Sequence, residues 1–223
     1  AGTWYLMADK KEGPYRVPKN PLLMGTGMGR IDHYVGRTIT NKGKRLMYCQ
    51  NWGSFTGCNW STPKLIQTEK NHELYLSYWP ELDVLKKGRI FATNSLSVKS
   101  DADKRYKIHD LAGVKASDFM LTCHVDITKA RSCTLTWRSQ LPLEPPQCEK
   151  TPTYGLRIEP KEGQFSLEQV YPKLHFGGNT YSTFLNDRYT SKELCGGGKM
   201  KLRLMVRKDR SEVYINDRWI FNV

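Results

Sequence analysis

The sequence predicts an all-β protein whose second half is a sandwich of two antiparallel sheets. Three observations lead to this prediction. Apolar and polar residues alternate in most of the patterned segments, which is the period of a β-strand. Short polar turns containing Asn, Asp or Gly separate these segments, as they do in antiparallel hairpins. No segment has the apolar spacing of an amphipathic helix.

The clearest alternation is at the end of the chain, in residues 199–223. The apolar positions of its first strand are Met200, Leu202, Leu204 and Val206. Polar turns at 208–211 and 216–218 then lead into strands at 212–215 and 219–223. Three short strands joined in this way form a meander with one apolar face, and a second sheet is needed to cover that face.

The first 90 residues read as a run of short strands. A glycine cluster at 25–29 lacks the Gly-Lys-Ser/Thr of a phosphate-binding loop, and no helical pattern follows it, so it is interpreted as a strand connection. The predicted strands are 3–7, 15–18, 21–24, the hairpin 34–40 with 44–49, and the hairpin 63–68 with 73–78, followed by a helical or turn-like connector at 79–85.

The second half begins with a polar, weakly patterned stretch, residues 90–118. We therefore divide the chain into segments 1–90 and 91–223. Apolar and polar residues alternate in 119–127, and the same alternation returns in 132–137. The two segments predict a hairpin that turns near Thr128. Four prolines make 141–152 a loop. The remaining predictions are a hairpin of 154–158 with 165–170 and a Gly- and Tyr-rich loop at 172–198 with room for one strand.

Cysteine usage favours a secreted or lumenal glycoprotein with disulfide bonds. The chain has six cysteines and one glycosylation sequon, Asn59-Trp60-Ser61. Cys49 and Cys58 bracket a loop, and Cys123 and Cys133 are placed symmetrically about the turn at Thr128, where they oppose each other. The alternative is that the cysteines are reduced and serve as small apolar side chains. The chain starts within a strand pattern, so we expect a processed or truncated protein.

The charge balance is strongly basic, with 35 Lys and Arg against 22 Asp and Glu, a net charge of +13. The charges are scattered, and no RNA-binding motif is present, so nucleic acid is not an expected partner. The cations at 199, 201, 203 and 207 are interpreted as a solvated outer strand face, with an anion-binding face as the alternative. No apolar stretch is long enough for a membrane helix. No Cys-x-x-C and no paired histidines are present, so we predict no metal and no cofactor.

Several motifs, taken in order, resemble one known family. In the first segment they are Gly13-Pro14-Tyr15, Asn20-Pro21-Leu22-Leu23, Tyr34-Val35-Gly36-Arg37-Thr38-Ile39, Gly43-Lys44-Arg45-Leu46-Met47, Thr62-Pro63-Lys64-Leu65, Glu73-Leu74-Tyr75-Leu76 and Pro80-Glu81-Leu82. In the second they are Leu202-Arg203-Leu204-Met205-Val206 and the run from Asp209 to Asp217. Their order and spacing are similar to the C-terminal part of glycoside hydrolase family 32, the β-fructosidases. The resemblance implies that 1–90 holds the last blade or blades of a five-bladed β-propeller and that 91–223 is a β-sandwich module.

The chain departs from this family in the catalytic motifs. The family hydrolyses sucrose or fructans with retention, using a carboxylate nucleophile, a general acid/base and a transition-state stabiliser. These lie in Asn-Asp-Pro, Arg-Asp-Pro and Glu-Cys motifs, none of which occurs in this sequence. The resemblance therefore implies that the catalytic carboxylates lie on a missing or separate N-terminal portion. The alternatives are a secreted glycan-binding or interaction protein that keeps the fold without the site, and a basic structural subunit of a larger assembly, including one that holds nucleic acid, for which steep salt dependence of binding would be the sign.

Four residues are candidates for contact with a carbohydrate. Asp32 and His33 precede the strand at 34–40, where a propeller loop faces the central funnel; a surface turn is the alternative. Trp52 and Trp60 lie in and beside the Cys49–Cys58 loop. Exposed tryptophan rings stack on sugars, and buried ones pack blades together, so both readings stay open.

Overall fold

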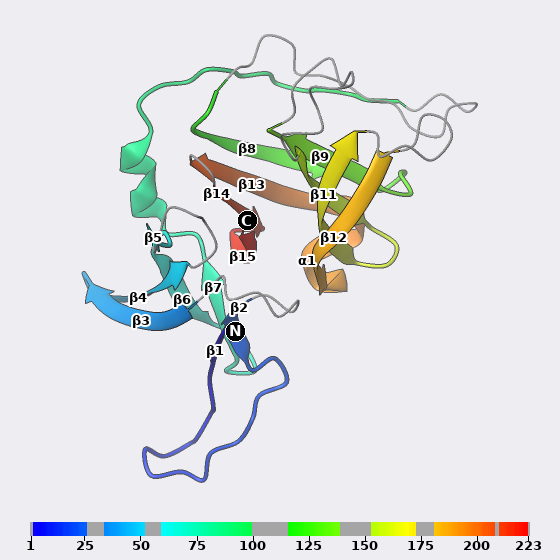
Figure 1. Ribbon diagram of the computed structural model, residues 1–223. Helices are drawn as coiled ribbons and strands as arrows, with labels where there is room; N and C mark the ends of the chain where they lie inside the picture. Colours follow the sequence, from blue (N-terminus) through cyan, green and yellow to red (C-terminus); the bar gives the residue numbers. More distant parts are fainter. Residues whose placement is uncertain are drawn as a thin grey trace.

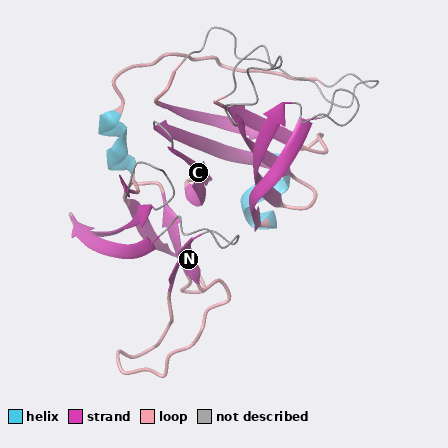
Figure 2. Ribbon diagram, viewed as in Figure 1, coloured by secondary structure: helices cyan, strands magenta, loops and turns pink. Residues whose placement is uncertain are grey.

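The structure of the protein is a computed structural model that describes residues 2–25, 34–51, 59–99, 116–138, 153–172, 181–207 and 210–222. Within these ranges the strands form antiparallel sheets of two, four and nine strands, and none of these sheets closes on itself (Figure 1 and Figure 2). The prediction of an all-β chain is confirmed.

The elements of the first half include both predicted hairpins. They are β1 (Gly2–Trp4), β2 (Leu22–Gly25), β3 (Tyr34–Asn41), β4 (Lys44–Asn51), β5 (Asn59–Trp60), β6 (Lys64–Thr68), β7 (Leu74–Ser77) and the 3-10 helix η1 (Pro80–Leu85). The β3–β4 turn consists of Lys42 and Gly43, whose φ angles of 48° and 74° are left-handed. A two-residue turn of this kind matches the twist of the strands that it joins. The predicted connector at 79–85 is η1.

The elements of the second half end in the predicted meander. They are β8 (Phe119–Asp126), β9 (Cys133–Trp137), β10 (Thr153–Glu159), β11 (Gln164–Pro172), β12 (Tyr181–Thr190), α1 (Lys192–Cys195), η3 (Gly196–Gly198), β13 (Lys199–Arg207), β14 (Arg210–Ile215) and β15 (Arg218–Asn222). The β14–β15 turn again has two left-handed residues, Asn216 and Asp217. One turn of helix, α1, was not predicted; Ser191 Oγ caps it by accepting a hydrogen bond from Leu194 N at 3.2 Å.

The nine-stranded sheet runs through both halves of the chain in the order β3-β4-β6-β7-β15-β14-β13-β8, with β5 paired to β4. The link between the halves is narrow. Ser77 of β7 pairs with Arg218 of β15, and Tyr78 N donates a hydrogen bond to Asp217 O at 2.8 Å. The last strand of the described chain therefore lies inside the sheet, between strands of the two halves.

The larger core lies between the four-stranded sheet, β12-β11-β10-β9, and the β8–β13–β14–β15 part of the long sheet. Phe165 and Leu167 contribute to it from the first sheet, and Leu202 and Ile215 from the second. Trp137 Nε1 also donates a hydrogen bond to Ser211 Oγ across the two sheets, at 2.8 Å.

A smaller core lies on the other face of β14. Tyr214 alternates with Val213 and Ile215, so it points away from the larger core. It packs with Met24, Met47, Cys49, Leu76, Tyr78, Leu82 and Trp219. The side chains of this core come from β2, β4, β7, η1, β14 and β15, so it fastens the first half of the chain to the second.

One prediction about the second half is wrong. β8 pairs with β13 and β9 pairs with β10, so the segments at 119–127 and 132–137 belong to different sheets and form no hairpin. The segment at 172–198, predicted as a loop with room for one strand, contains one strand, β12, together with α1 and η3, which were not predicted. Cys123, Cys133 and Cys195 are free thiols, and Cys58 and Cys148 lie outside the described residues.

Candidate functional site

Of the four residues predicted to contact a carbohydrate, the structure describes Trp60. Asp32, His33 and Trp52 lie outside the described residues. Trp60 is on β5 at the surface, with 60% of its area exposed. Its ring meets that of Tyr48 edge to face, with centroids 5.3 Å apart and planes at 71°. This contact fixes the ring and leaves apolar area in the solvent, which suits stacking on a sugar.

Trp60 belongs to one face of the sheet β3–β4–β6–β7. Ile39 pairs with Leu46, and Trp60 pairs with Gln50, two strand positions beyond Tyr48. Cross-strand partners and every second residue share a face, so Ile39, Tyr48 and Trp60 point to the same side. Ile39 is 52% exposed. This face therefore presents Ile39 and Trp60 to solvent, whereas Leu46, on the same face, is buried.

The opposite face of the same sheet carries a groove of about 400 Å³ under the β1–β2 sheet. Its floor is apolar, and three threonine hydroxyls and one guanidinium line its sides. The lining residues are Thr3, Leu23, Gly36, Thr38, Arg45, Met47, Ile66, Thr68 and Leu74. They come from six strands, so no contiguous motif could have indicated the groove.

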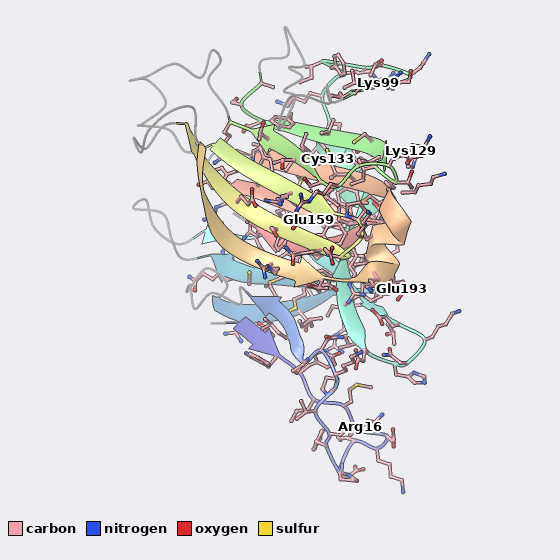
Figure 3. All side chains as sticks on the ribbon, turned by 90° about the vertical axis from the view of Figure 1, so that its right-hand side faces the viewer. Arg16, Lys99, Lys129, Cys133, Glu159 and Glu193 are labelled. Atoms are coloured by element: carbon pink, nitrogen blue, oxygen red, sulfur yellow. The ribbon has the colours of Figure 1, made fainter. Side chains whose placement is uncertain are left out.

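Residues 5–21 connect β1 to β2 and form an arm that extends from the groove. Its base is fastened to the β6–β7 turn: the Glu73 carboxylate accepts from Lys19 N at 2.7 Å and from Asn20 Nδ2 at 3.2 Å. Beyond this base the arm projects away from the sheets, and Figure 3 shows Arg16 on it, far from the sandwiched strands. Large apolar side chains on the arm and on the adjoining end of β1 are more than half exposed: Trp4, Leu6, Tyr15 and Val17.

A buried ion pair joins the two halves of the chain. Lys64 Nζ of β6 lies 2.9 Å from Glu212 Oε1 of β14, and both side chains are less than a tenth exposed. Thr62 Oγ1 and Tyr214 OH each donate a hydrogen bond to the Glu212 carboxylate. Lys64 Nζ also donates to Thr62 O at 3.0 Å and lies 5.7 Å from the centroid of the Trp219 ring.

The electrostatics of this pair suit a structural role. Burial raises the pKa of Glu212, but the Lys64 charge and the hydrogen bonds from Thr62 and Tyr214 outweigh it, so the pKa is lowered overall. Burial and the adjacent Glu212 raise the pKa of Tyr214 far above its ordinary value. The carboxylate is thus ionised, fully hydrogen-bonded and shielded from solvent. It fastens two strands and cannot serve as an acid, base or nucleophile toward a solvent-borne substrate.

The basic face predicted on β13 is not solvated along its whole length. The Arg203 guanidinium is 3.7 Å from the centroid of the Tyr78 ring, and its Nη2 donates to Asp217 Oδ1 at 3.0 Å. Lys201 Nζ donates to Asp217 Oδ2 at 2.7 Å. Arg203 is only 7% exposed, and its Nη1 also lies 3.8 Å from Asp83 Oδ1 of η1. At this position the predicted solvated face is wrong, and the cation forms part of the fastening between the halves.

Two kinds of feature were sought among the described residues. Among them, no group of three or more His, Cys, Asp and Glu side chains could hold a metal ion. No helix in the described ranges is long and apolar enough to span a membrane.

Comparison with known proteins gives no assignment. No protein-family model matches the chain, and no curated protein matches it in sequence. The functional interpretation therefore depends on the motifs of the sequence and on the geometry of its open surfaces.

Proposed function

We propose that this chain is the C-terminal portion of a β-fructosidase-like glycoside hydrolase that acts on sucrose or fructans. In this proposal residues 1–90 supply the last blade of a five-bladed propeller, and residues 91–223 supply a two-sheet β-sandwich. The catalytic carboxylates lie on an N-terminal portion that is missing or is a separate chain. The protein is secreted or lumenal, in keeping with its sequon and its cysteines.

The observation that carries the proposal is the sheet β3–β4–β6–β7. Its strands are antiparallel neighbours in chain order, which is the arrangement of a propeller blade. A blade has neighbours against both faces, and this sheet has exposed apolar side chains on one face, at Ile39 and Trp60, and an open groove on the other. The exposed apolar residues of the arm extend the same uncovered surface.

The occupant that we propose for this surface is the N-terminal propeller portion. The blade already contacts the second half of the chain through the smaller core and the Lys64–Glu212 pair. The net charge of +13 favours an acidic partner. A second copy of this chain would carry the same net charge of +13, so the two copies would repel each other.

The test combines native mass with turnover. A particle from the natural source that is well above 25.8 kDa and contains a second, different chain is expected, and that particle should release fructose from sucrose, inulin or levan. The purified 223-residue chain should release none. Turnover by the chain alone would refute the assignment of the catalytic carboxylates to another portion. A lone 25.8 kDa monomer from the natural source would refute the propeller assignment.

The exposure of Trp60 favours a second candidate, a glycan-binding protein without turnover. In that case the isolated chain should be retained by immobilised fructan or by spots on a glycan array. Trp60→Ala should weaken retention, because stacking of a sugar on the ring is lost. Trp4→Ala is the matched control, because Trp4 is similarly exposed, at 64% against 60%, but lies on β1. Equal loss in both variants would exclude a site at Trp60.

A further inference from the structure

Cys123 and Cys133 lie on the edge strands of the two facing sheets. β8 is the last strand of the nine-stranded sheet, and β9 is the last strand of the four-stranded one. The chain passes from one to the other through residues 127–132, where Ala130 N donates a hydrogen bond to Ile127 O at 2.9 Å. This turn brings the two edges together at one end, and Figure 3 shows Cys133 at the edge of its sheet.

Both cysteines point into the space between the sheets. Cys123 pairs with Leu202, and Cys133 pairs with Ile158; Leu202 and Ile158 are both buried in the larger core. Cross-strand partners share a face, so the two thiols share the inward direction of these partners. Their neighbours along each strand are more exposed, as alternation requires.

The two cysteines are also level with each other along the strands. Trp137 donates a hydrogen bond to Ser211 at 2.8 Å. Ser211 of β14 pairs with Val206 of β13, which in turn pairs with Phe119 of β8. Trp137 and Phe119 are therefore at the same level. Cys133 precedes Trp137 by four residues and Cys123 follows Phe119 by four. Because the turn reverses the chain, the same step along each strand ends at the same level.

The electrostatics of the two thiols agree with this proximity. Burial raises the pKa of both thiols, and the neighbouring Cys133 raises the pKa of Cys123 further. A like-charge effect of this kind requires the two sulfur atoms to be near each other.

We propose that Cys123 and Cys133 form an oxidation site, a dithiol that a low-molecular-weight disulfide converts into a disulfide bond between the two sheets. In the reaction one cysteine thiolate attacks oxidised glutathione and expels one glutathione thiolate, which leaves a mixed disulfide. The second cysteine thiolate then attacks the sulfur of the first and expels the second glutathione thiolate. The two cysteines lose two electrons, and one glutathione disulfide becomes two thiols.

The site has two expected properties. Only the thiolate attacks, and both thiols have raised pKa values, so oxidation is slow at pH 7 and accelerates as the pH rises. The bond closes a short loop of the chain and joins the sheets where β8 and β9 share no backbone hydrogen bonds. A loop of this length is expected to raise the melting temperature by about 5–10 °C. The proposal is independent of the hydrolase assignment.

The test is peptide mapping of the intact chain after equilibration with mixtures of oxidised and reduced glutathione at pH 8. Trypsin places Cys123 in peptide 116–129 and Cys133 in peptide 132–138. Under non-reducing conditions these two peptides should appear joined, and reduction should separate them. The melting temperature of the wild type should rise on oxidation, and that of Cys133→Ser should not.

The mapping of the wild-type chain needs no variant, so the test stands even if Cys133→Ser folds poorly. Cys195→Ser is a control, because it removes a buried thiol on α1 and should leave the joined peptides unchanged. The proposal is overturned if both peptides stay reduced while other cysteines oxidise. It is also overturned if Cys123 or Cys133 is found joined to a different cysteine.

Discussion

Removing the Lys64 charge should destabilise the protein severely. Lys64→Met keeps most of the side-chain volume but leaves Glu212 ionised and buried with hydrogen bonds from Thr62 and Tyr214 alone. Breaking one side of a buried ion pair costs about 3–5 kcal/mol. For a chain of this size that corresponds to a fall of about 10 °C in melting temperature. Urea unfolding followed by tryptophan fluorescence measures the loss, since Trp219 lies beside Lys64.

The cost of this substitution should depend on pH in a defined direction. In the wild type the pKa of Glu212 is lowered, so the stability that this group contributes is present above its unfolded pKa and is lost as the pH falls through the folded value. In Lys64→Met, burial is no longer outweighed, and the pKa of Glu212 should be raised instead. Acid then neutralises the buried carboxyl, so the deficit of the variant should be largest at pH 7 and smaller at pH 5.

A double variant and a surface variant complete the experiment. Lys64→Met with Glu212→Gln removes both charges and keeps an oxygen acceptor, so it should recover most of the lost stability. Lys44→Met breaks the exposed pair with Glu81 and should leave the unfolding midpoint nearly unchanged. If Lys64→Met costs less than about 1 kcal/mol, or if its deficit is the same at pH 5 and pH 7, the ion pair does not fasten the two halves.

Two further predictions concern the larger core and the arm. Trp137→Phe should lower the free energy of unfolding by about 1–3 kcal/mol, because Ser211 loses its buried donor; equal urea midpoints for variant and wild type would contradict this. Gly36→Ala should loosen the arm, because a methyl group there would overlap Thr3 Oγ1 and Met47 Cε under the β1–β2 sheet. Limited proteolysis should then cut within residues 5–21 faster than in the wild type, and an unchanged rate would contradict this.

Local patterns were sufficient to predict the hairpins. Gly43 in the first turn and Asn216 and Asp217 in the second are residue types that adopt left-handed φ angles readily, and alternating segments flank each turn. Such signals lie within a dozen residues of the strands that they join, so they can be read from the chain without knowledge of the rest of the fold. The connector at 79–85 was identifiable because Pro80 starts a helical turn readily.

Strand partners were not predictable in the same way. Alternation gives the face that a residue presents, and Cys123 and Cys133 do face the core as their pattern indicates. It does not give the neighbouring strand, so the short connection at 127–132 looked like a hairpin although it crosses between sheets. The sequence left room for one strand in 172–198 but did not locate β12, because its segment, Tyr181–Thr190, is polar and lacks a clean period of two.

The buried polar contacts depend on long-range placement. Lys64 and Glu212 are distant in sequence, and each looks like an ordinary exposed strand residue until β6 and β14 are placed near each other. Arg203 likewise belongs to a basic alternating run, and it becomes buried only when the fold places it against Tyr78 and Asp217. The assignments of Asp32, His33 and Trp52 to a carbohydrate site stay predictions.

The position of β15 has a consequence for the order in which the protein is made. During translation, β7 emerges from the ribosome long before β15, and its free edge has no partner until residues 218–222 have been synthesised. Until then the exposed edge is open to pairing with other nascent chains. The first half of the protein should therefore depend on molecular chaperones until the final strand is inserted between β7 and β14.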